Sequence, residues 1–473
     1  MISLNAESSL VVAGILVALW RGTARKPWPA WSIARPDIAS WIALALTIAL
    51  AFGYIAGTYF LSDDFLLLKH ARSEWTWRGV FTIGGGDGFF RPLGDMSYAL
   101  SVRAADSNPA LWHWIGFALH AANGVLVYAL AMTLGYSRFA AWLTGTVFVL
   151  HAAHPEAVVW MAGRFDLLAA FFVLAGLIAF HRYLERETAA LGWLAIATSA
   201  MIAALLSKES AYAFGPLAAL LVVCTNGTRR PRAWSAVLGF VLITAAMFTY
   251  RWRLQGGLGG YGSVSVFGSA KALLFRMWAI LFFPVSRALP AVGWWFSLLT
   301  LGYAAALILL FLSRSERAKL AFALGFAILT AAPAIAQLAI GPDLEKSRVL
   351  YLPSAGFCLL VGGLAGIARM RTAVAAVLII FQAAALWHNL TGWRMASEMV
   401  ESVCKAVADC AVHSEANPQV KGLPRIWHGV YTFANGFAEC VEMNRKPKVD
   451  ATPGSVGCQF RFDDATGAIE PVQ

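Results

Sequence analysis

Two adjacent aspartates, Asp63 and Asp64, follow the apolar stretch from Ile38 to Leu61. That stretch is long enough to cross a bilayer, which takes about 20 residues, so we expect the pair at one end of a membrane-spanning helix. Neighbouring carboxylates repel each other, which favours protonation of one of them. Such a carboxylate is suited to act as a general base toward a hydroxyl nucleophile. The alternative is a solvated helix end, and the spacing does not decide which aspartate would be the base.

Other charged, histidine and tyrosine residues recur near the ends of later apolar stretches. An ionised side chain at mid-bilayer costs about 2.5 to 3.5 kcal/mol on insertion scales, so such groups normally face a cavity or one another. The alternation of basic loops puts all of them on the outward side, where we expect one site that also includes the two aspartates. These residues are Arg91, His113, His151, His154, Glu156, Arg164, Asp166, Lys208, Glu209, Arg251, Arg253, Lys346, Arg348 and Tyr351.

Two of the cations in this set, Lys208 and Arg348, are suited to neutralise a phosphate, because a fixed cation pairs well with anionic oxygens. A structural ion network is the alternative. Arg164 with Asp166, and Lys208 with Glu209, are opposite charges at spacings that do not face each other on a helix. Each of these four residues is therefore expected to pair with a different partner.

The spacing of His151, His154 and Glu156 permits a divalent metal. Pro155 interrupts the helix between these candidate ligands. A metal is therefore possible here but not favoured, and no cofactor is predicted.

The composition is that of a membrane protein. Of 473 residues, 59% are hydrophobic and only 13% are charged, whereas soluble domains have about 25% charged residues. The formal net charge of +11 is spread over short segments between apolar stretches, as is typical of cytoplasmic loops. The basic residues therefore orient the chain in a lipid bilayer and do not indicate nucleic-acid binding.

The apolar stretches and basic loops predict about 11 membrane-spanning helices. The segment Lys271 to Pro284 is interpreted as re-entrant or interfacial, because a full span there would break the alternation of basic loops. The segment Ser9 to Trp20 is either a twelfth span or an interfacial helix. The predicted spans are Ile38 to Leu61, Ala110 to Leu134, Phe139 to Ala153, Phe165 to Tyr183, Leu191 to Leu206, Tyr212 to Cys224, Ala233 to Tyr250, Val292 to Leu312, Leu320 to Gln337, Leu352 to Ala368 and Thr372 to Leu390.

Four of the six cysteines lie in the polar tail after the last span. Clustered cysteines in a small polar segment indicate two disulfides in an oxidising compartment, with the connectivity open. Zinc is the competing interpretation, but the tail has no closely spaced cysteine pair of the kind typical of zinc sites. The four are Cys404, Cys410, Cys440 and Cys458.

We expect three parts in the chain. Residues 1–37 form an N-terminal hydrophobic helix and a basic cytoplasmic segment, and residues 38–390 form the transmembrane module, with a first outer loop at 62–109. Residues 391–473 form a small mixed tail domain, with a helix near Ala396 to Ala411 and short strands such as Gly429 to Phe433.

Several ordered sequence blocks resemble the GT-C glycosyltransferases, particularly bacterial relatives of the transmembrane and TPR-containing O-mannosyltransferases. The resemblance covers about residues 38–390 and departs at the tail, where the eukaryotic members carry TPR repeats. The blocks are Ser62-Asp63-Asp64-Phe65, Phe90-Arg91-Pro92-Leu93, His113 with the His120 to Asn123 stretch, HAAHPEAVVWMAGRFDLL from His151 to Leu168, Leu206-Ser207-Lys208-Glu209, and SRVLYLPSAGFCLL from Ser347 to Leu360.

This resemblance implies an all-α polytopic membrane protein of the GT-C type, with about 11 to 12 transmembrane helices and a small disulfide-containing mixed C-terminal domain. It implies a place in the bacterial inner membrane, with the site and the tail periplasmic. The implied reaction is inverting transfer of a sugar, of the hexosyl or mannosyl type, from a polyprenyl-phosphate donor to a hydroxyl-bearing acceptor.

The resemblance also implies roles for individual residues. Asp63 matches the general base, with Asp64 as the fallback. Arg348, aided by Lys208 or Arg164, would stabilise the departing lipid phosphate. The residues that would shape the sugar or acceptor site are Arg91, His154, Glu156, Asp166, Glu209 and Tyr351.

Two other classes of function are compatible with a polytopic protein: a transporter or flippase of lipid-linked sugars, and a noncatalytic membrane scaffold. A transporter would place its site near the bilayer midplane, often between repeated halves. Here the ionisable residues gather at one face, which favours the enzyme.

Overall fold

The fold is taken from a computed structural model. The predicted N-terminal segment Ser9 to Trp20 lies outside its described part. The described residues are 34–82, 89–186, 191–225, 231–257, 275–290, 293–311, 317–338, 340–366, 371–413, 419–445 and 458–471.

Apolar helices make up most of the described chain. Seven helical segments are long and apolar enough to cross a membrane, and three shorter apolar ones accompany them. The chain is therefore a multi-pass membrane protein. Each of the eleven predicted spans falls on one of eleven described helices, although the ends differ. These are α2 (Arg35–Phe52), α6 (Pro109–Thr133), α7 (Arg138–Val149), α9 (Arg164–Glu185), α10 (Leu191–Leu205), α11 (Phe214–Cys224), α12 (Pro231–Gln255), α15 (Trp294–Phe311), α16 (Arg317–Ala331), α17 (Tyr351–Ala365) and α18 (Arg371–His413).

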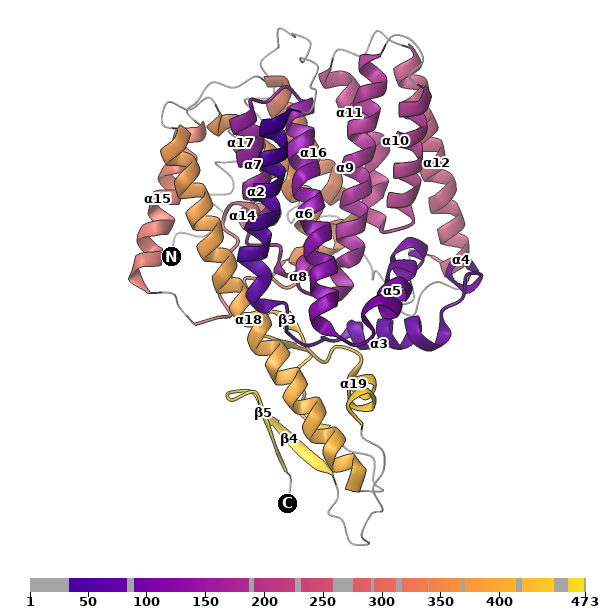
Figure 1. Cartoon of the computed structure of the whole chain (residues 1–473), viewed down its shortest axis with the longest axis vertical. Coiled ribbons are helices and arrows are strands. Elements are labelled where there is room, and N and C mark those ends of the chain that lie inside the picture. Colours follow the sequence, from indigo (N-terminus) through magenta and orange to yellow (C-terminus); the bar gives the residue numbers. More distant parts are fainter. Residues whose placement is uncertain are drawn as a thin grey trace.

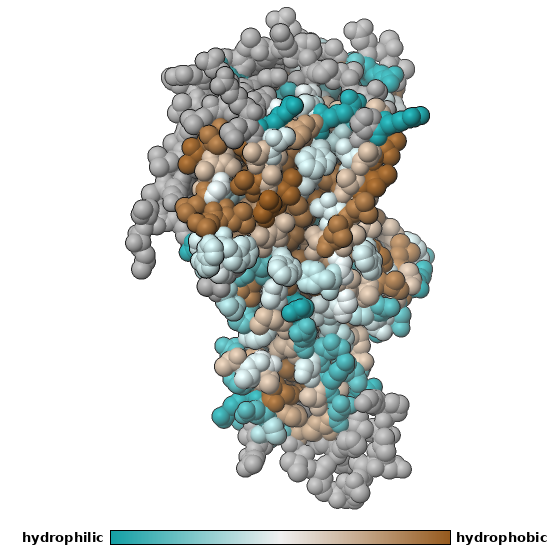
Figure 2. Space-filling model, turned by 60° about the vertical axis from the view of Figure 1, so that its left-hand side comes forward, coloured by the Kyte–Doolittle hydropathy of each residue, from teal (hydrophilic) through white to brown (hydrophobic). Residues whose placement is uncertain are grey.

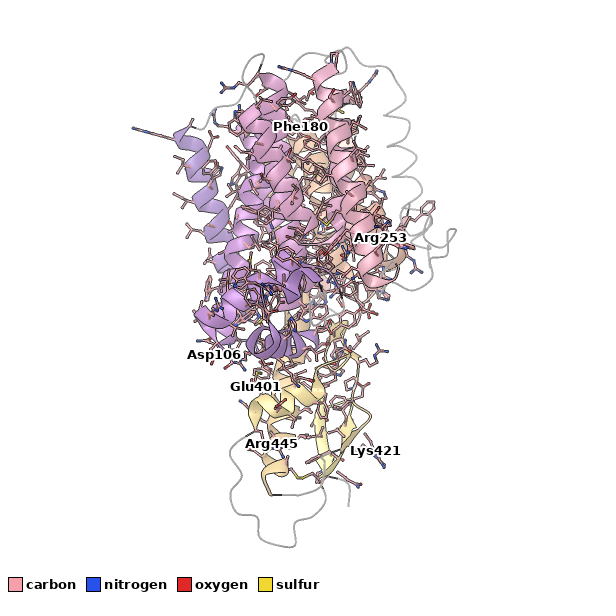
Figure 3. All side chains as sticks on the ribbon, turned by 90° about the vertical axis from the view of Figure 1, so that its right-hand side faces the viewer. Asp106, Phe180, Arg253, Glu401, Lys421 and Arg445 are labelled. Atoms are coloured by element: carbon pink, nitrogen blue, oxygen red, sulfur yellow. A yellow bond between two sulfur atoms is a disulfide. The ribbon has the colours of Figure 1, made fainter. Side chains whose placement is uncertain are left out.

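The helices run side by side as a bundle, and the C-terminal part of the chain projects from one end of it (Figure 1). Figure 2 shows a band of apolar side chains over the bundle, bordered by polar residues on both sides. Large apolar side chains on the bundle are exposed; Leu50 on α2, for example, is 84% exposed. This is the surface expected of a bundle that faces lipid. Phe180 and Asp106 mark its two ends in Figure 3.

Short helical segments gather at the end of the bundle from which the tail projects. They come from the loops between the long helices, where Gly, Pro and polar residues interrupt the apolar runs. These segments are η1 (Gly53–Ile55), α3 (Asp63–Lys69), the π-helical turn η2 (His70–Glu74), α4 (Gly79–Thr82), α5 (Pro92–Ala105), α8 (Pro155–Val158), η3 (Met161–Gly163), η4 (Glu209–Ala213), η7 (Ala332–Gln337) and η8 (Ser347–Leu350). One further short helix, α14 (Met277–Phe282), lies partway along the bundle (Figure 1).

The segment predicted to be re-entrant is described only in part. Its described helix, α14, has six residues, too few to cross a bilayer. The buried side chains of Trp278 and Leu281 turn it toward the interior of the bundle. Residues 271–274 lie outside the described part.

Close helix packing in the bundle depends on small residues. A Cβ on Gly356 of α17 would lie 2.5 Å from the backbone nitrogen of Ala327 and 2.6 Å from the carbonyl oxygen of Ala323, both on α16. Small residues let the backbones of membrane helices approach in this way. This contact holds the helix that follows η8, and hence Arg348, against the bundle.

The last helix continues without a break into the tail. Helix α18 has 43 residues, so the helix predicted near Ala396 to Ala411 is the second half of the last span, and no boundary in the backbone marks residue 391. The only glycine within it, Gly392, stays helical and packs against Leu289, whose side chain would be 3.1 Å from an added Cβ.

The tail folds around the exposed half of α18. One sheet has the order β1-β4-β5, with β1 (Gln419–Lys421) parallel to β4 (Gln459–Asp463) and β4 antiparallel to β5 (Ala468–Pro471). A two-stranded ribbon pairs β2 (Ile426–Trp427) with β3 (Val430–Tyr431), where the sequence predicts a strand at Gly429 to Phe433.

Helix α19 (Phe437–Asn444) follows the ribbon. The predicted two disulfides are confirmed and join Cys404 to Cys440 and Cys410 to Cys458. Both begin on α18, so this helix anchors the whole tail.

Candidate active site

A cavity of about 280 Å³ opens among the short helices at the tail end of the bundle. Its wall combines one carboxylate, three cations, two carboxamides and apolar side chains from segments far apart in the sequence. Four of the predicted site residues, Asp63, Arg91, Lys208 and Arg348, line it. The full lining is Asp63, Leu66, Leu67, Phe89, Arg91, Ala162, Phe165, Lys208, Gln337, Arg348 and Asn435.

The two adjacent aspartates differ in their surroundings. Asp63 begins α3 and faces the cavity, half-buried. Asp64 is 2% exposed and accepts backbone N–H groups from Leu61 (3.1 Å) and Ala162 (2.8 Å). Burial raises the pKa of the Asp64 carboxyl to about 8, even though these two donors act in the opposite direction. Asp64 thus fixes the backbone of the site, whereas Asp63 is open to a ligand.

Lys208 lies just before η4 and pairs with Asp166 on α9, with 2.5 Å between Nζ and Oδ2. Burial lowers the pKa of Lys208 to about 8, and the nearby cations Arg348 and Arg91 act in the same direction against the attraction of Asp166. The ammonium group is therefore charged at neutral pH and loses its charge in mildly alkaline solution.

Arg91 precedes α5 and forms the second cation of the wall. Its guanidinium donates to both carboxylate oxygens of Glu209, at 3.3 and 3.0 Å, and Arg251 pairs with the same carboxylate. The Arg91 guanidinium also lies over the Phe89 ring, 4.2 Å from its centroid. Two arginines share one carboxylate here, so the cluster keeps positive charge available to an anion.

Arg348 on η8 is the third cation. Its Nε lies 3.7 Å from Oε1 of Glu156, and its backbone N–H and the Ser347 hydroxyl donate to Oε2 of that carboxylate, each at 3.3 Å. Burial raises the pKa of Glu156 to about 7 although Arg348 opposes the shift. The guanidinium stacks over the ring of Trp160, 4.4 Å from its centroid.

The tail supplies one wall of the cavity. The Asn435 side-chain amide donates to Oδ1 of Asp63 at 2.7 Å. Sequence reasoning missed Asn435, because it lies in a loop without a motif and 372 residues from its partner. No signal in the sequence singles it out.

Of the predicted site residues that do not line the cavity, three contact partners away from it. Arg164 is buried between the rings of Tyr98 and Trp112 and donates to the Ser101 hydroxyl at 2.6 Å. Arg164 therefore does not reach the cavity in which a donor phosphate is predicted to bind.

The other two, His154 and Tyr351, belong to a buried polar cluster within the bundle. His154 Nε2 lies 2.8 Å from the Ser354 hydroxyl. The Tyr351 hydroxyl lies 2.7 Å from His120 Nδ1 and accepts from Asn123 at 3.0 Å. This cluster joins helices α6 and α17 behind the cavity.

The residues considered for a metal do not converge. His151 Nε2 lies 3.0 Å from the carbonyl oxygen of Leu281, whereas His154 and Glu156 contact different partners. Within the ranges that the structure describes, no group of three or more His, Cys, Asp or Glu residues is arranged to hold a metal ion.

No family model matches the chain. Protein O-mannosyl-transferase Tmtc1 of Drosophila melanogaster is 34% identical over 136 residues, 28% of this chain and 16% of that protein. Protein O-mannosyl-transferase TMTC2 of Homo sapiens is 27% identical over 158 residues, 31% of this chain and 19% of that protein. The matched part is less than a fifth of the length of either relative. The predicted resemblance to this group is confirmed.

Among solved structures, ArnT from Cupriavidus metallidurans in the apo state aligns over 90% of this chain and 94% of that chain, with a TM-score of 0.50 and 14% identity. The predicted GT-C fold is confirmed. A structure of ArnT bound to undecaprenyl phosphate aligns over 92% of this chain and 87% of that chain, with a TM-score of 0.49.

Proposed function

We propose that this protein is a membrane glycosyltransferase that moves a sugar from a polyprenyl-phosphate donor to a hydroxyl-bearing acceptor, with inversion. The observation that carries the proposal is the cavity in which one open carboxylate, Asp63, shares a wall with Arg91, Lys208 and Arg348. Inverting transfer needs a base for the acceptor and positive charge for the leaving phosphate, and this wall offers both.

Asp63 is the proposed general base. One of its carboxylate oxygens takes the acceptor proton while the acceptor oxygen forms its bond to the anomeric carbon. The bond between that carbon and the phosphate oxygen breaks on the opposite face, and its electron pair leaves with the lipid phosphate. Asp64 is a poor candidate for this step, because it is buried and already accepts two backbone N–H groups.

Arg348 and Lys208 are the proposed partners of the departing phosphate, with Arg91 beside them. Each cation is already oriented by a carboxylate, Glu156, Asp166 or Glu209 respectively. Oriented cations stabilise developing charge without a cost of reorganisation during the reaction. The three carboxylates are therefore proposed to act through the cations, and to shape the sugar or acceptor site.

The finer features of the proposal come from the resemblance. The named relatives are O-mannosyl-transferases, which supports a mannosyl-type sugar. The proposed location is the bacterial inner membrane, with the site and the tail on the periplasmic face, because both disulfides lie in the tail at that end. The proposed division is residues 1–37, 38–390 and 391–473, with α18 shared by the last two.

The test compares membranes that contain the wild type, Asp63→Asn or Asp463→Asn. Each is supplied with a synthetic polyprenyl-phosphate mannose, and the release of lipid phosphate is measured. Asp63→Asn is expected to lower transfer by about 10²- to 10⁴-fold, the usual contribution of a general base. Asp463→Asn, a carboxylate of the tail sheet far along the chain, is the control and should retain wild-type transfer.

Two outcomes would count against the proposal. Full transfer by Asp63→Asn would remove Asp63 as the base. If the wild type transfers no sugar from polyprenyl-phosphate mannose or from the corresponding glucose or galactose donors, the donor class is wrong and a transporter or scaffold becomes the better interpretation.

A further inference from the structure

The loop between β3 and α19 contacts the start of α3 along its backbone. The Ser62 N–H donates to the carbonyl oxygen of Thr432 at 3.1 Å, and the Asn435 N–H donates to the Ser62 hydroxyl at 3.3 Å. Gly436 follows with φ of +76°, and a Cβ there would lie 2.4 Å from the Ser62 carbonyl oxygen. Only glycine fits so close an approach in this conformation.

This contact brings a carboxamide to the carboxylate of Asp63. Asn435 Nδ2 lies 2.7 Å from Asp63 Oδ1, and the Ser62 hydroxyl lies 3.5 Å from the same oxygen. An amide donor restricts the rotation of a carboxylate. No residue in the described part of the chain hydrogen-bonds to the other carboxylate oxygen, Oδ2, which leaves it open to an acceptor hydroxyl.

The same part of the tail also contacts the phosphate side of the cavity. The Tyr431 ring stacks on Trp160, with centroids 5.2 Å apart and planes at 21°. The Arg348 guanidinium lies 4.4 Å from the Trp160 centroid and 5.8 Å from that of Tyr431. The Tyr431 hydroxyl donates to Glu345 at 2.7 Å. The guanidinium is thus held against two aromatic rings, one of which belongs to the tail.

Covalent and polar anchors hold this loop in place. Cys440 on α19 is joined to Cys404 on α18, and the Thr432 hydroxyl donates to the carbonyl oxygen of Pro424 at 2.8 Å. At the far end of α19, the Asn444 amide donates to the Tyr59 hydroxyl at 2.8 Å. The tail is therefore fastened on both sides of Asn435.

We propose that the C-terminal tail completes the active site, and that Asn435 is a positioning residue that holds the Asp63 carboxylate oriented toward the acceptor. This inference rests on the proposed function for its catalytic consequence. The contact itself predicts a measurable property of Asp63 that does not depend on any substrate. In this proposal the tail is part of the catalytic unit, independently of which acceptor the protein uses.

Other charges near Asp63 must be kept constant in a test of this pairing. Arg91, Lys208 and Arg348 share its cavity and Asp64 is its neighbour. On the packed helix α19, Glu439 and Glu442 pair with Lys69 of α3. Replacement of Asn435 by alanine leaves all of these groups in place and removes one donor.

The first experiment measures the reactivity of the Asp63 carboxyl. The full chain in detergent micelles is treated with a carbodiimide, which modifies carboxyl groups. The modification of Asp63 is located by fragmentation mass spectrometry. In Asn435→Ala, labelling of Asp63 at a fixed pH should be about three- to tenfold faster, because the carboxyl loses the amide that donates to it and covers it.

The matched control is Gln459→Ala, which also removes an exposed carboxamide from the tail but lies on β4 and does not line the cavity. It should leave the labelling of Asp63 unchanged. Asn435 is exposed, so its replacement is not expected to unfold the tail. Intact disulfides in both variants, counted by thiol titration, verify this.

The second experiment measures transfer from synthetic polyprenyl-phosphate mannose. Asn435→Ala should lower kcat about tenfold with little change in KM for the donor. Unchanged labelling and an unchanged kcat in Asn435→Ala, with an active wild type, would overturn the inference and leave the proposed function intact. Faster labelling in Asn435→Ala together with a wild type that transfers no sugar would refute the function and leave the contact between tail and aspartate established.

Discussion

Replacement of Asp64 by asparagine separates the structural aspartate from the proposed catalytic one. Burial raises the pKa of Asp64 in the folded protein to about 8, whereas its ordinary value is 3.8. Between these two values the folded state holds a proton that the unfolded state has lost. Its contribution to stability is therefore complete below about pH 4 and disappears as the pH rises through 8.

The size of the effect follows from proton linkage. Over pH 5 to 7 the folded state binds nearly one more proton at Asp64 than the unfolded state, which lowers the free energy of unfolding by roughly 1 kcal/mol per pH unit, or roughly 2 to 3 kcal/mol in all. Asparagine resembles the protonated carboxyl in shape and does not titrate. The variant should lose this part of the slope, whatever its absolute stability.

The assay is reversible unfolding in mixed detergent micelles at pH 5, 6 and 7, with the free energy of unfolding of the wild type and of Asp64→Asn compared at each pH. Glu156 has a pKa raised to about 7 by burial, so it contributes a similar slope in both proteins and cancels in the difference. Asp463 serves as control, because the Thr466 hydroxyl lowers the pKa of that carboxyl. Its contribution is present above its unfolded pKa and lost only at lower pH, so Asp463→Asn should keep the wild-type slope.

Equal slopes for the wild type and Asp64→Asn would show that Asp64 is ionised in the folded protein throughout this range. The two aspartates would then carry adjacent negative charges, and the argument that burial separates their roles would fail.

Three further predictions concern the cations and the tail. Because burial lowers the pKa of Lys208 to about 8, transfer should fall as the pH rises through 8, and Lys208→Arg should move this basic limb of the pH profile upward. Cys440→Ser should lower transfer more than Cys458→Ser, since only the Cys404–Cys440 disulfide adjoins the loop at the cavity. The two disulfides close segments of 36 and 48 residues, so loop-closure entropy predicts that each stabilises the folded tail by about 4 kcal/mol. Gly436→Ala should lower the hydrogen-exchange protection of α19 and reduce transfer, because its Cβ would lie 2.4 Å from the Ser62 carbonyl oxygen; unchanged exchange there would show that the loop adapts freely.

The bundle could be predicted from the sequence because its signals are local. Apolar length determines which segments form spans. The end of the last span was not predictable in this way. Helix α18 continues beyond the apolar run, since the polar residues after Leu390 retain one buried face, with Val400, Cys404 and Val407 packed under the tail. A change in composition marks the membrane boundary but not the end of a helix.

The sequence indicated which charged residues to consider for the site, but not which way each side chain points. Charge at the span ends placed Lys208 and Arg348 in one predicted set, and both line the cavity that Asp63 also lines. Their roles there stay predictions. Arg164 satisfies the same sequence criteria but points between aromatic rings, because a side chain at a helix start can face the cavity or the core. His154 and Tyr351 turn inward for the same reason.

The difference between Asp63 and Asp64 also follows from helix geometry. Successive residues on a helix point about 100° apart, so two adjacent aspartates on α3 cannot face the same environment when one side is cavity and the other is protein interior. Asp64 meets the backbone of the η3 turn, and Asp63 meets the cavity and Asn435. Because the two aspartates are adjacent on a helix, their side chains have different surroundings and do not form one shared site.

The precise placement of a tail residue against the first outer helix requires a rigid connection, and α18 provides it. A 43-residue helix is about 65 Å long, so it runs through the bundle and out to the tail as one element. Cys404 lies on its outer half and holds α19 close to it, and Gly436 allows the loop before α19 to touch the Ser62 backbone. Motion of the tail relative to the bundle would therefore have to bend this helix or break the contact at Asp63, which couples the integrity of the tail to the state of the proposed base.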